Sequence, residues 1–247
     1  MKLLIVGDCH GFGGMMSAAH VAVELSADAI IACGDVWDVD RSIYIARDNT
    51  NAVPPFHMIP GNHERWSIWA KGLFADGIVA HLDYTKFELG GRTFGVIGRI
   101  DDTPRVRELM DLGLWLGEPP EMFFTRLEGQ QVRDALGGSD VLLFHDAPFP
   151  FVLGHRPIST AQEWIGLGPA DTEIIGSRYL NEVIRTIEPK LVFHGHMHLL
   201  DIRYIKQTRI YGLPPIDPTF TRRGYVLLDT ATLRAQYFDM SGEKLDG

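Results

Sequence analysis

Short runs of apolar residues recur along the chain, and polar residues follow each of them directly. The runs are rich in β-branched residues, which favours buried strands over short helices. They cover residues 3–6, 29–33, 53–59, 141–144 and 191–193. The sequence therefore predicts a core of short strands whose carboxyl ends lead into polar loops.

Apolar residues at helical spacing lie between several of these strands. Met15, Ala18, Ala22 and Leu25 share one face of a predicted helix. Further helices are predicted at 66–73, 126–136 and 178–188, and Ser177 is the expected N-cap of the last. Strands that alternate with helices predict an α/β fold.

Strands predominate in the second half of the chain. Gly90 and Gly91 separate two alternating segments, which is typical of a hairpin turn whose residues have positive φ. Later strands are predicted at 201–205, 208–211, 225–228 and 235–238. We expect one domain over residues 1–247, because no linker or internal repeat is present.

Two insertions without clear periodicity interrupt this pattern, at about 99–125 and 149–176. Long segments of this kind are uncommon in compact domains and often serve as lids or binding loops. Both are therefore candidates for a substrate cap or lid.

Ligand-type side chains follow five of the predicted strands. They are Asp8 and His10, Asp35, Asn62 and His63, His145, and His196 and His198. Ligands of open α/β sheets bind at the carboxyl ends of the strands. Residues two apart in an extended segment point the same way, so each of the pairs 8/10 and 196/198 is expected to grip one side of a metal centre.

The donor chemistry narrows the choice of metal. Imidazole, carboxylate and amide groups without a thiolate favour Mn, Fe, Zn or Ni over copper. These candidates outnumber the ligands that one tetrahedral zinc needs. They suit two divalent transition-metal ions that share a carboxylate, an arrangement used for phosphoester hydrolysis. Manganese is the first expectation.

Five segments resemble, in the same order, the motifs of the calcineurin-like metallophosphoesterases. They are Asp8-Cys9-His10, Gly34-Asp35-Val36-Trp37-Asp38, Gly61-Asn62-His63-Glu64, His145 with Pro148, and Gly195-His196-Met197-His198. The resemblance runs from near the start to about residue 200. It implies a four-layer αββα sandwich with a dinuclear metal site at the carboxyl ends of the strands.

The resemblance also implies a ligand set. It places Asp8, His10 and His198 on one metal, Asn62, His145 and His196 on the other, and Asp35 between both.

In such enzymes a metal-bound hydroxide would attack phosphorus in line. The resemblance implies that His63 faces the phosphate from outside the ligand set, as a general acid or oxyanion donor, and that Asp38 orients it. By contrast, we expect only a local hydrogen bond for His194, and a loop-bracing role for Glu64.

Two departures bear on the substrate. Val39 follows Asp38 where phosphoprotein phosphatases of this fold have an arginine, and Asp146-Ala147 follows His145 where they have glycines. The favoured hypothesis is therefore a phosphodiesterase or phosphomonoesterase for small phosphoesters, with Arg156 as a candidate phosphate contact. Two alternatives stay open: a serine/threonine-type phosphoprotein phosphatase, and a catalytically silent interaction module of the same fold.

Charge and cysteine content change this picture little. A formal net charge of -9 argues against a nucleic-acid partner, because bulk repulsion opposes contacts with phosphate backbones. Cys9 and Cys33 cannot form a disulfide framework, and no apolar run reaches membrane-spanning length. We expect a cytoplasmic protein without a membrane partner; the sequence does not indicate an oligomeric state.

Overall fold

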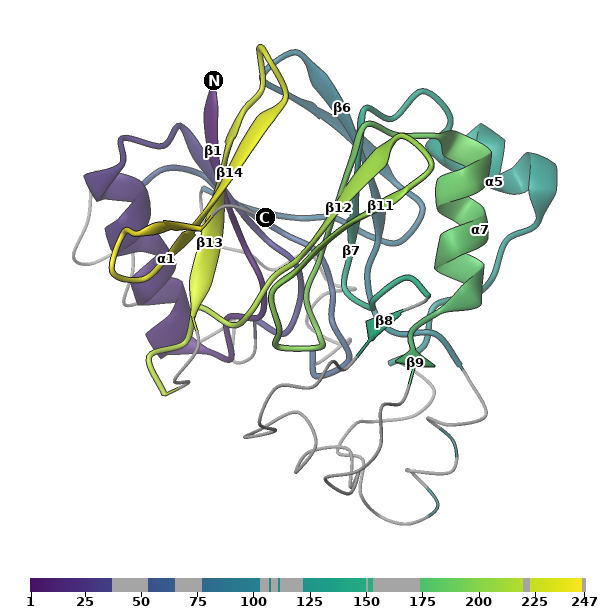
Figure 1. The fold of residues 1–247 in the computed structure, drawn as a ribbon, viewed down its shortest axis with the longest axis horizontal. Helices are drawn as coiled ribbons and strands as arrows, with labels where there is room; N and C mark the ends of the chain where they lie inside the picture. Colours follow the sequence, from purple (N-terminus) through teal and green to yellow (C-terminus); the bar gives the residue numbers. More distant parts are fainter. Residues whose placement is uncertain are drawn as a thin grey trace.

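Two mixed β-sheets form the centre of the molecule (Figure 1). The computed structural model describes residues 1–36, 53–64, 77–102, 107, 111, 122–149, 151–152, 174–219 and 223–245. All structural statements below concern these residues. The predicted helix at 66–73 and most of both insertions lie outside them.

The first sheet has the strand order β15-β14-β13-β1-β2-β3-β4. Its strands are β1 (Lys2–Val6), β2 (Ala29–Ala32), β3 (Phe56–Met58), β4 (Ile78–Ala80), β13 (Gly224–Asp229), β14 (Arg234–Asp239) and β15 (Lys244–Leu245). The strands from β1 to β4 are parallel, and β13 pairs antiparallel with β1. The loops after β1, β2 and β3 therefore leave the sheet at the same edge.

The second sheet has the order β11-β12-β10-β7-β6-β5. Its strands are β5 (Lys86–Leu89), β6 (Arg92–Ile97), β7 (Val141–Phe144), β10 (Leu191–His194), β11 (Asp201–Ile205) and β12 (Thr208–Gly212). The four inner strands are parallel, and an antiparallel strand covers each edge. A separate pair joins β8 (Phe151–Val152) to β9 (Ile174–Ile175).

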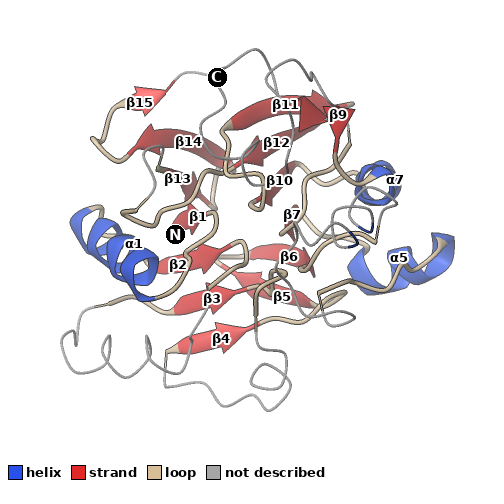
Figure 2. Ribbon diagram, turned by 90° about the horizontal axis from the view of Figure 1, so that it is seen from below, coloured by secondary structure: helices blue, strands red, loops and turns tan. Residues whose placement is uncertain are grey.

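In the described part of the chain, three helices cover the outer faces of the sheets (Figure 2). They are α1 (Phe12–Glu24), which lies on the first sheet, and α5 (Gly129–Leu136) and α7 (Arg178–Ile187), which lie on the second. Leu3 and Ile5 of β1 face the core between the two sheets, whereas Leu4 and Val6 face α1. This alternation, which follows from the two-residue period of a strand, produces the predicted four-layer αββα sandwich.

The predicted helix and turn signals are largely confirmed. Ser177 caps α7, because its side chain accepts a hydrogen bond from the backbone N–H of Leu180 at 3.1 Å. Gly90 and Gly91 form the turn between β5 and β6 with φ of 58° and 72°. In contrast, α5 begins at Gly129 rather than at 126, because its N-cap is Glu128, which forms a capping box.

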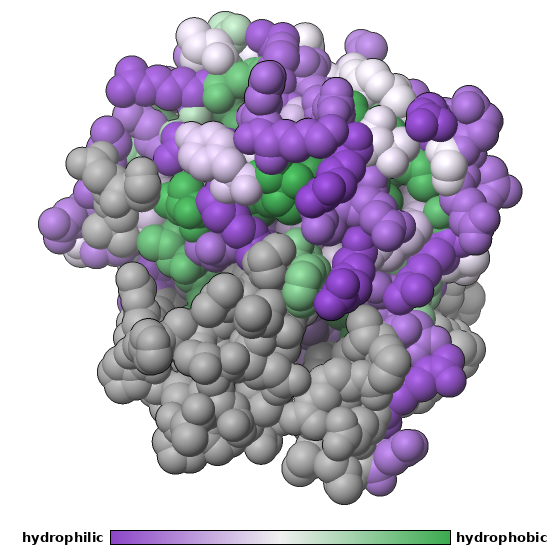
Figure 3. All heavy atoms as spheres, turned by 45° about the vertical axis from the view of Figure 1, so that its right-hand side comes forward, coloured by the Kyte–Doolittle hydropathy of each residue, from purple (hydrophilic) through white to green (hydrophobic). Residues whose placement is uncertain are grey.

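Among the coloured residues of Figure 3, hydrophilic ones predominate, and apolar ones reach the surface in patches between them. The apolar stripe of α7, with Leu180, Val183 and Ile184, is buried against the second sheet. None of the helices in the described part of the chain is long and apolar enough to cross a membrane.

Candidate metal centre

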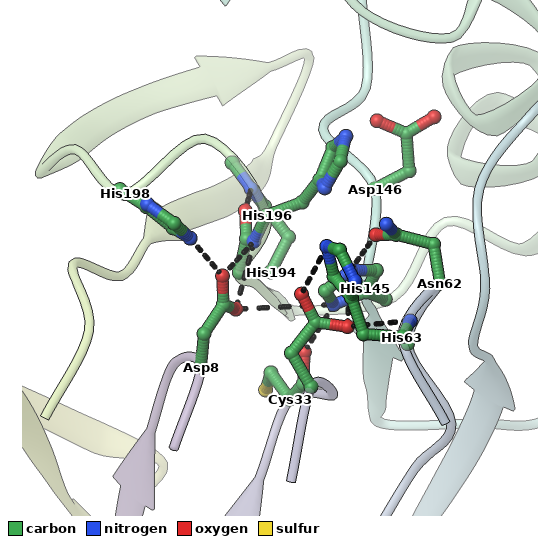
Figure 4. Close-up of polar contacts among 12 residues, drawn as sticks. Asp8, Cys33, Asn62, His63, His145, Asp146, His194, His196 and His198 are labelled. Carbon is green, nitrogen blue, oxygen red and sulfur yellow. Dashed lines mark hydrogen bonds and ion pairs between the residues drawn. The ribbon is translucent and has the colours of Figure 1, made fainter. Parts of the chain in front are cut away.

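Polar side chains from both sheets converge where the parallel strands end (Figure 4). Those from the first sheet follow β1, β2 and β3, and those from the second follow β7 and β10. They are Asp8, His10, Asp35, Asn62 and His63 on one side, and His145, His196 and His198 on the other. The predicted strand-end residues therefore meet at the seam between the sheets.

Asp8, His10 and His198 form one group, with one donor atom from each within 4.8 Å of the others. The Nε2 atom of His198 lies 2.7 Å from Asp8 Oδ2, and His10 Nε2 lies 3.8 Å from the same oxygen. The two Nε2 atoms are 3.0 Å apart. Three donors thus point at one small volume.

Asp35, His145 and His196 form the second group. Asp35 Oδ1 lies 3.5 Å from His145 Nε2. Asn62 joins the group, because its Oδ1 lies 2.8 Å from the same nitrogen. Whether Asp35 also contacts the first group's ion stays a prediction.

The backbone fixes the orientation of the His145 ring. Its Nδ1 lies 2.8 Å from the carbonyl oxygen of Cys33, which can only accept, so Nδ1 carries a proton and donates it. Nε2 then points toward Asn62 and Asp35. Histidines that bind metals commonly donate their second nitrogen to a carbonyl in this way.

The surroundings keep negative charge at the centre. Burial raises the pKa of Asp8, but His198, His145 and His10 together outweigh burial and hold that pKa below its ordinary value. Burial also opposes the charge of Asp35, and His145 and His63 together lower its pKa. For His145 itself, burial lowers the pKa, but Asp35 and Asp8 raise it to about 9.

Two other imidazoles favour the neutral form. Burial and the neighbouring His145 lower the pKa of His196 to about 3. Burial likewise lowers the pKa of His10. Neutral imidazoles beside buried carboxylates are the form in which both residues bind a cation.

The donor geometry fits two metal ions. Nitrogen and oxygen ligands lie about 2.0–2.2 Å from a bound transition-metal ion, so adjacent ligands are about 3 to 3.5 Å apart. The separations of 2.7, 3.0 and 3.8 Å in the first group and 3.5 Å in the second span this range. A cation would also serve as a shared partner for Asn62 Oδ1 and His145 Nε2, which lie 2.8 Å apart.

The loops depart from the extended geometry assumed for the paired ligands. His10, His196 and His198 have φ of 46°, 63° and 52°, which belong to the left-handed region. His196 and His198 consequently fall into different groups, so the expectation that they grip one side of a single centre is wrong. Asp8 and His10 do share a group.

The carboxylate of Asp8 also holds a backbone group of the loop after β10, a contact that the sequence did not indicate. It accepts the backbone N–H of His196 on both oxygens, at 2.9 and 3.1 Å. The loop after β10 is therefore tied to the loop after β1. No local pattern could show this, because the residues are 188 positions apart.

His63 lies beside the metal groups and belongs to neither. Its backbone N–H donates to Asp35 Oδ1 at 3.1 Å, and its Nε2 lies 3.9 Å from Asp35 Oδ2. His194 ends β10 and makes the expected local contact, with Nδ1 3.1 Å from the Gly195 carbonyl oxygen. Asp38 and Arg156 lie outside the described residues, so their predicted roles stay predictions.

Glu64 braces the site. Its carboxylate accepts the backbone N–H of Val36 at 2.6 Å and that of Gly61 at 2.5 Å. Burial, together with the charge of Asp35, raises the pKa of Glu64 to about 8. The loops that carry Asp35 and Asn62 are thereby joined.

Comparison with known proteins decides the family. Residues 1–200 match the family described as calcineurin-like phosphoesterase. The chain belongs to this family. Calcineurin-like phosphoesterases depend on two metal ions, and the two groups of donors correspond to such a pair.

Solved structures confirm the calcineurin-like fold. The crystal structure of TT1561 of Thermus thermophilus has a TM-score of 0.60 at 17% identity, covering 96% of this chain and 98% of that one. GAP50 of Plasmodium, named as the anchor in the inner membrane complex, has a TM-score of 0.55 at 11% identity, covering 100% and 87%. At these identities the likeness shows the fold alone. A search of curated protein sequences finds no match.

Proposed function

We propose that the chain is a dinuclear-metal phosphoesterase that hydrolyses small phosphoesters, as a phosphodiesterase or phosphomonoesterase. The observation that carries this proposal is the convergence of two donor groups at the seam between the sheets. The family membership of residues 1–200 supports it. The single-domain organisation of the chain is part of the same proposal.

In this proposal Asp8, His10 and His198 hold one ion, Asn62, His145 and His196 hold the other, and Asp35 contacts both. When bound, two such ions supply Lewis-acid stabilisation of phosphoryl oxygens and a nucleophile at neutral pH. The oxygen and nitrogen donors suit Mn first, and Fe, Zn or Ni as alternatives.

The role of His63 follows from its attachment. Its backbone is tied to Asp35, while its ring lies outside both donor groups. The ring lies beside both groups, with Nε2 3.9 Å from Asp35 Oδ2, and is proposed to stabilise charge on the phosphoryl oxygens or to protonate the leaving oxygen. Asp38 is proposed to orient this ring.

A reducing compartment such as the cytoplasm suits the two cysteines. Both are buried free thiols, and they belong to different cores, Cys9 on the side of α1 and Cys33 between the sheets. The two thiols are therefore not placed to form a disulfide with each other.

A substrate panel tests the proposed function. Hydrolysis of bis-p-nitrophenyl phosphate and of p-nitrophenyl phosphate would be measured with Mn, Ni, Zn and Mg, with a phosphopeptide as a third substrate. We expect turnover of at least one small ester, dependent on added metal and abolished in Asp35→Asn. Turnover of the phosphopeptide alone would favour a phosphoprotein phosphatase. Metal binding without any turnover would favour a silent interaction module.

A further inference from the structure

Three distant segments of the chain meet at the side chain of Asp101, which is 1% exposed. Its Oδ2 accepts the hydroxyl hydrogen of Ser177 at 2.6 Å, and its Oδ1 accepts Arg126 Nε–H at 2.8 Å. Asp101 and Arg126 lie at the two ends of the first insertion, and Ser177 lies just beyond the second. The ends of both insertions are thus joined at one carboxylate.

Asp146, the residue that follows His145, is hydrogen-bonded to the backbone of Asp101. The carboxylate of Asp146 accepts the backbone N–H of Asp101 at 3.0 Å and that of Ala147 at 2.8 Å. The backbone N–H of Ser177 donates to the Ala147 carbonyl at 2.8 Å. The turn after β7 is consequently held from both sides by buried polar groups.

The His145 ring requires a fixed backbone. It spans the seam, because the ring belongs to the second sheet while its Nδ1–H donates to Cys33 after β2. Binding constellations work only when their atoms are held within about 0.5 Å of the required positions. The strand ladder holds the backbone of His145, whose N–H donates to the Ile97 carbonyl at 3.3 Å and whose carbonyl accepts the Gly195 N–H at 3.1 Å. On its C-terminal side the chain leaves the strand at Asp146.

We propose that Asp101 and Asp146 are positioning residues for His145. Asp146 fixes the turn by holding two backbone N–H groups, and Asp101 is itself held by Ser177 and Arg126. Loss of either carboxylate lets the turn move and weakens the hold of His145 on its ion. This inference rests on the proposed function only in taking His145 as a metal ligand.

The first measurement needs neither metal nor activity. In metal-free protein labelled with ¹⁵N-histidine, the solvent exchange of the His145 Nδ1–H proton reports the hydrogen bond to Cys33. We expect Asp101→Asn and Asp146→Asn to raise this exchange rate about tenfold, because local opening becomes easier. Arg126→Gln should raise it about threefold, since Arg126 is half exposed and its loss leaves the Ser177 contact intact.

The second measurement is metal binding by calorimetry with Mn²⁺ or Zn²⁺. We expect the dissociation constant of the ion held by His145 to rise about 10- to 100-fold in both Asn variants, and that of the other ion by less than about threefold. The matched control is Thr208→Val, which removes a buried hydroxyl bond to the Pro189 carbonyl at the opposite end of β10. Thr208→Val should change neither the exchange rate of the His145 Nδ1–H proton nor the dissociation constants of the ions.

Exchange rates and affinities within about twofold of the wild type, despite a lower melting temperature, would show a purely structural role and overturn the proposal. An equal rise in the dissociation constants of both ions would overturn the proposal as well. If the wild type binds only one ion, the proposed function fails, and the exchange rate alone decides the positioning role. If the Asn variants do not fold, Arg126→Gln decides the positioning role by the same criteria.

Discussion

Replacement of Glu64 by glutamine tests whether the site depends on its brace. The two carboxylate oxygens of Glu64 each accept one backbone N–H, from Val36 at 2.6 Å and from Gly61 at 2.5 Å. Glutamine has the same shape but replaces one oxygen with an NH₂ group. One of the two backbone donors would then face another donor.

The magnitude follows from the number of bonds affected. A buried N–H group left without an acceptor costs about 1–3 kcal/mol. Glu64→Gln loses one acceptor and keeps one, so we expect the free energy of unfolding to fall by about 1–3 kcal/mol. Because the brace joins the loops of Asp35 and Asn62, turnover should also fall about 10- to 100-fold, as for other residues that orient metal ligands.

Urea denaturation of the metal-free protein gives the first quantity, and steady-state kinetics at saturating metal give the second. The matched control is Glu188→Gln, because Glu188 is exposed and its carboxylate pairs with the exposed Lys206 at 2.6 Å. Glu188→Gln should change neither the free energy of unfolding nor the turnover by a measurable amount. Wild-type stability and turnover in Glu64→Gln would refute the brace. A loss of stability with full turnover would show that the loops hold their ligands without it.

Four further predictions concern the metals, the chemistry and pH. Asp35→Asn should lower turnover at least about tenfold more than Asp8→Asn, because Asp35 is proposed to contact both ions; equal residual activity at saturating metal would contradict the shared role. His63→Ala should lower turnover of an alkyl phosphoester about 10²- to 10⁴-fold while elemental analysis still finds two ions per chain; loss of an ion would make His63 a ligand. Saturating Mn²⁺ at about 100 times its dissociation constant should stabilise the chain by about 2.7 kcal/mol per ion, so a chelator should lower the melting temperature by several degrees in calorimetry; an unchanged melting temperature would argue against both sites. His57 and His81, whose ring nitrogens are 3.0 Å apart, both have pKa values lowered by burial, that of His81 from 6.5 to about 4. The free energy of unfolding should therefore be highest above pH 6.5 and fall by about 1–2 kcal/mol as the pH drops toward 4. His81→Phe should flatten this part of the stability profile measured in urea, and an equally steep profile would exclude the pair as its cause.

The sequence sufficed for those features in which a local pattern carries the information. An apolar run followed by Gly-Asp predicted where β2 ends and where Asp35 lies, and Ser177 predicted the start of α7. Proline explains a shorter strand than expected: Pro54 and Pro55 have no N–H to donate, so β3 begins only at Phe56. The short strands β4 and β15 carry too few residues to give a pattern, and they were not predicted.

Features that depend on distant partners could not be predicted. The Cys33 carbonyl that orients His145 is a backbone group, which leaves no mark on the sequence, and its partner is 112 residues away. Asp101 and Ser177 are 76 residues apart, and each alone looks like an ordinary loop or cap residue. Alternation of side chains failed for His196 because the chain turns there with positive φ. Motif order finds the ligands, whereas their arrangement depends on how the two sheets meet.

That meeting of the sheets explains why the ligands are spread over so much of the chain. The first sheet contributes the buried carboxylates of Asp8 and Asp35, and the second contributes His145 and His196. Two buried carboxylates in one sheet would repel each other and be costly to ionise. The imidazoles of the opposite sheet lower that cost, since His145 lies 3.8 Å from Asp8 and 3.5 Å from Asp35. Neither sheet has a complete donor group by itself, so the site forms only when the sandwich closes, and an ion bound there stabilises the packing of one sheet on the other.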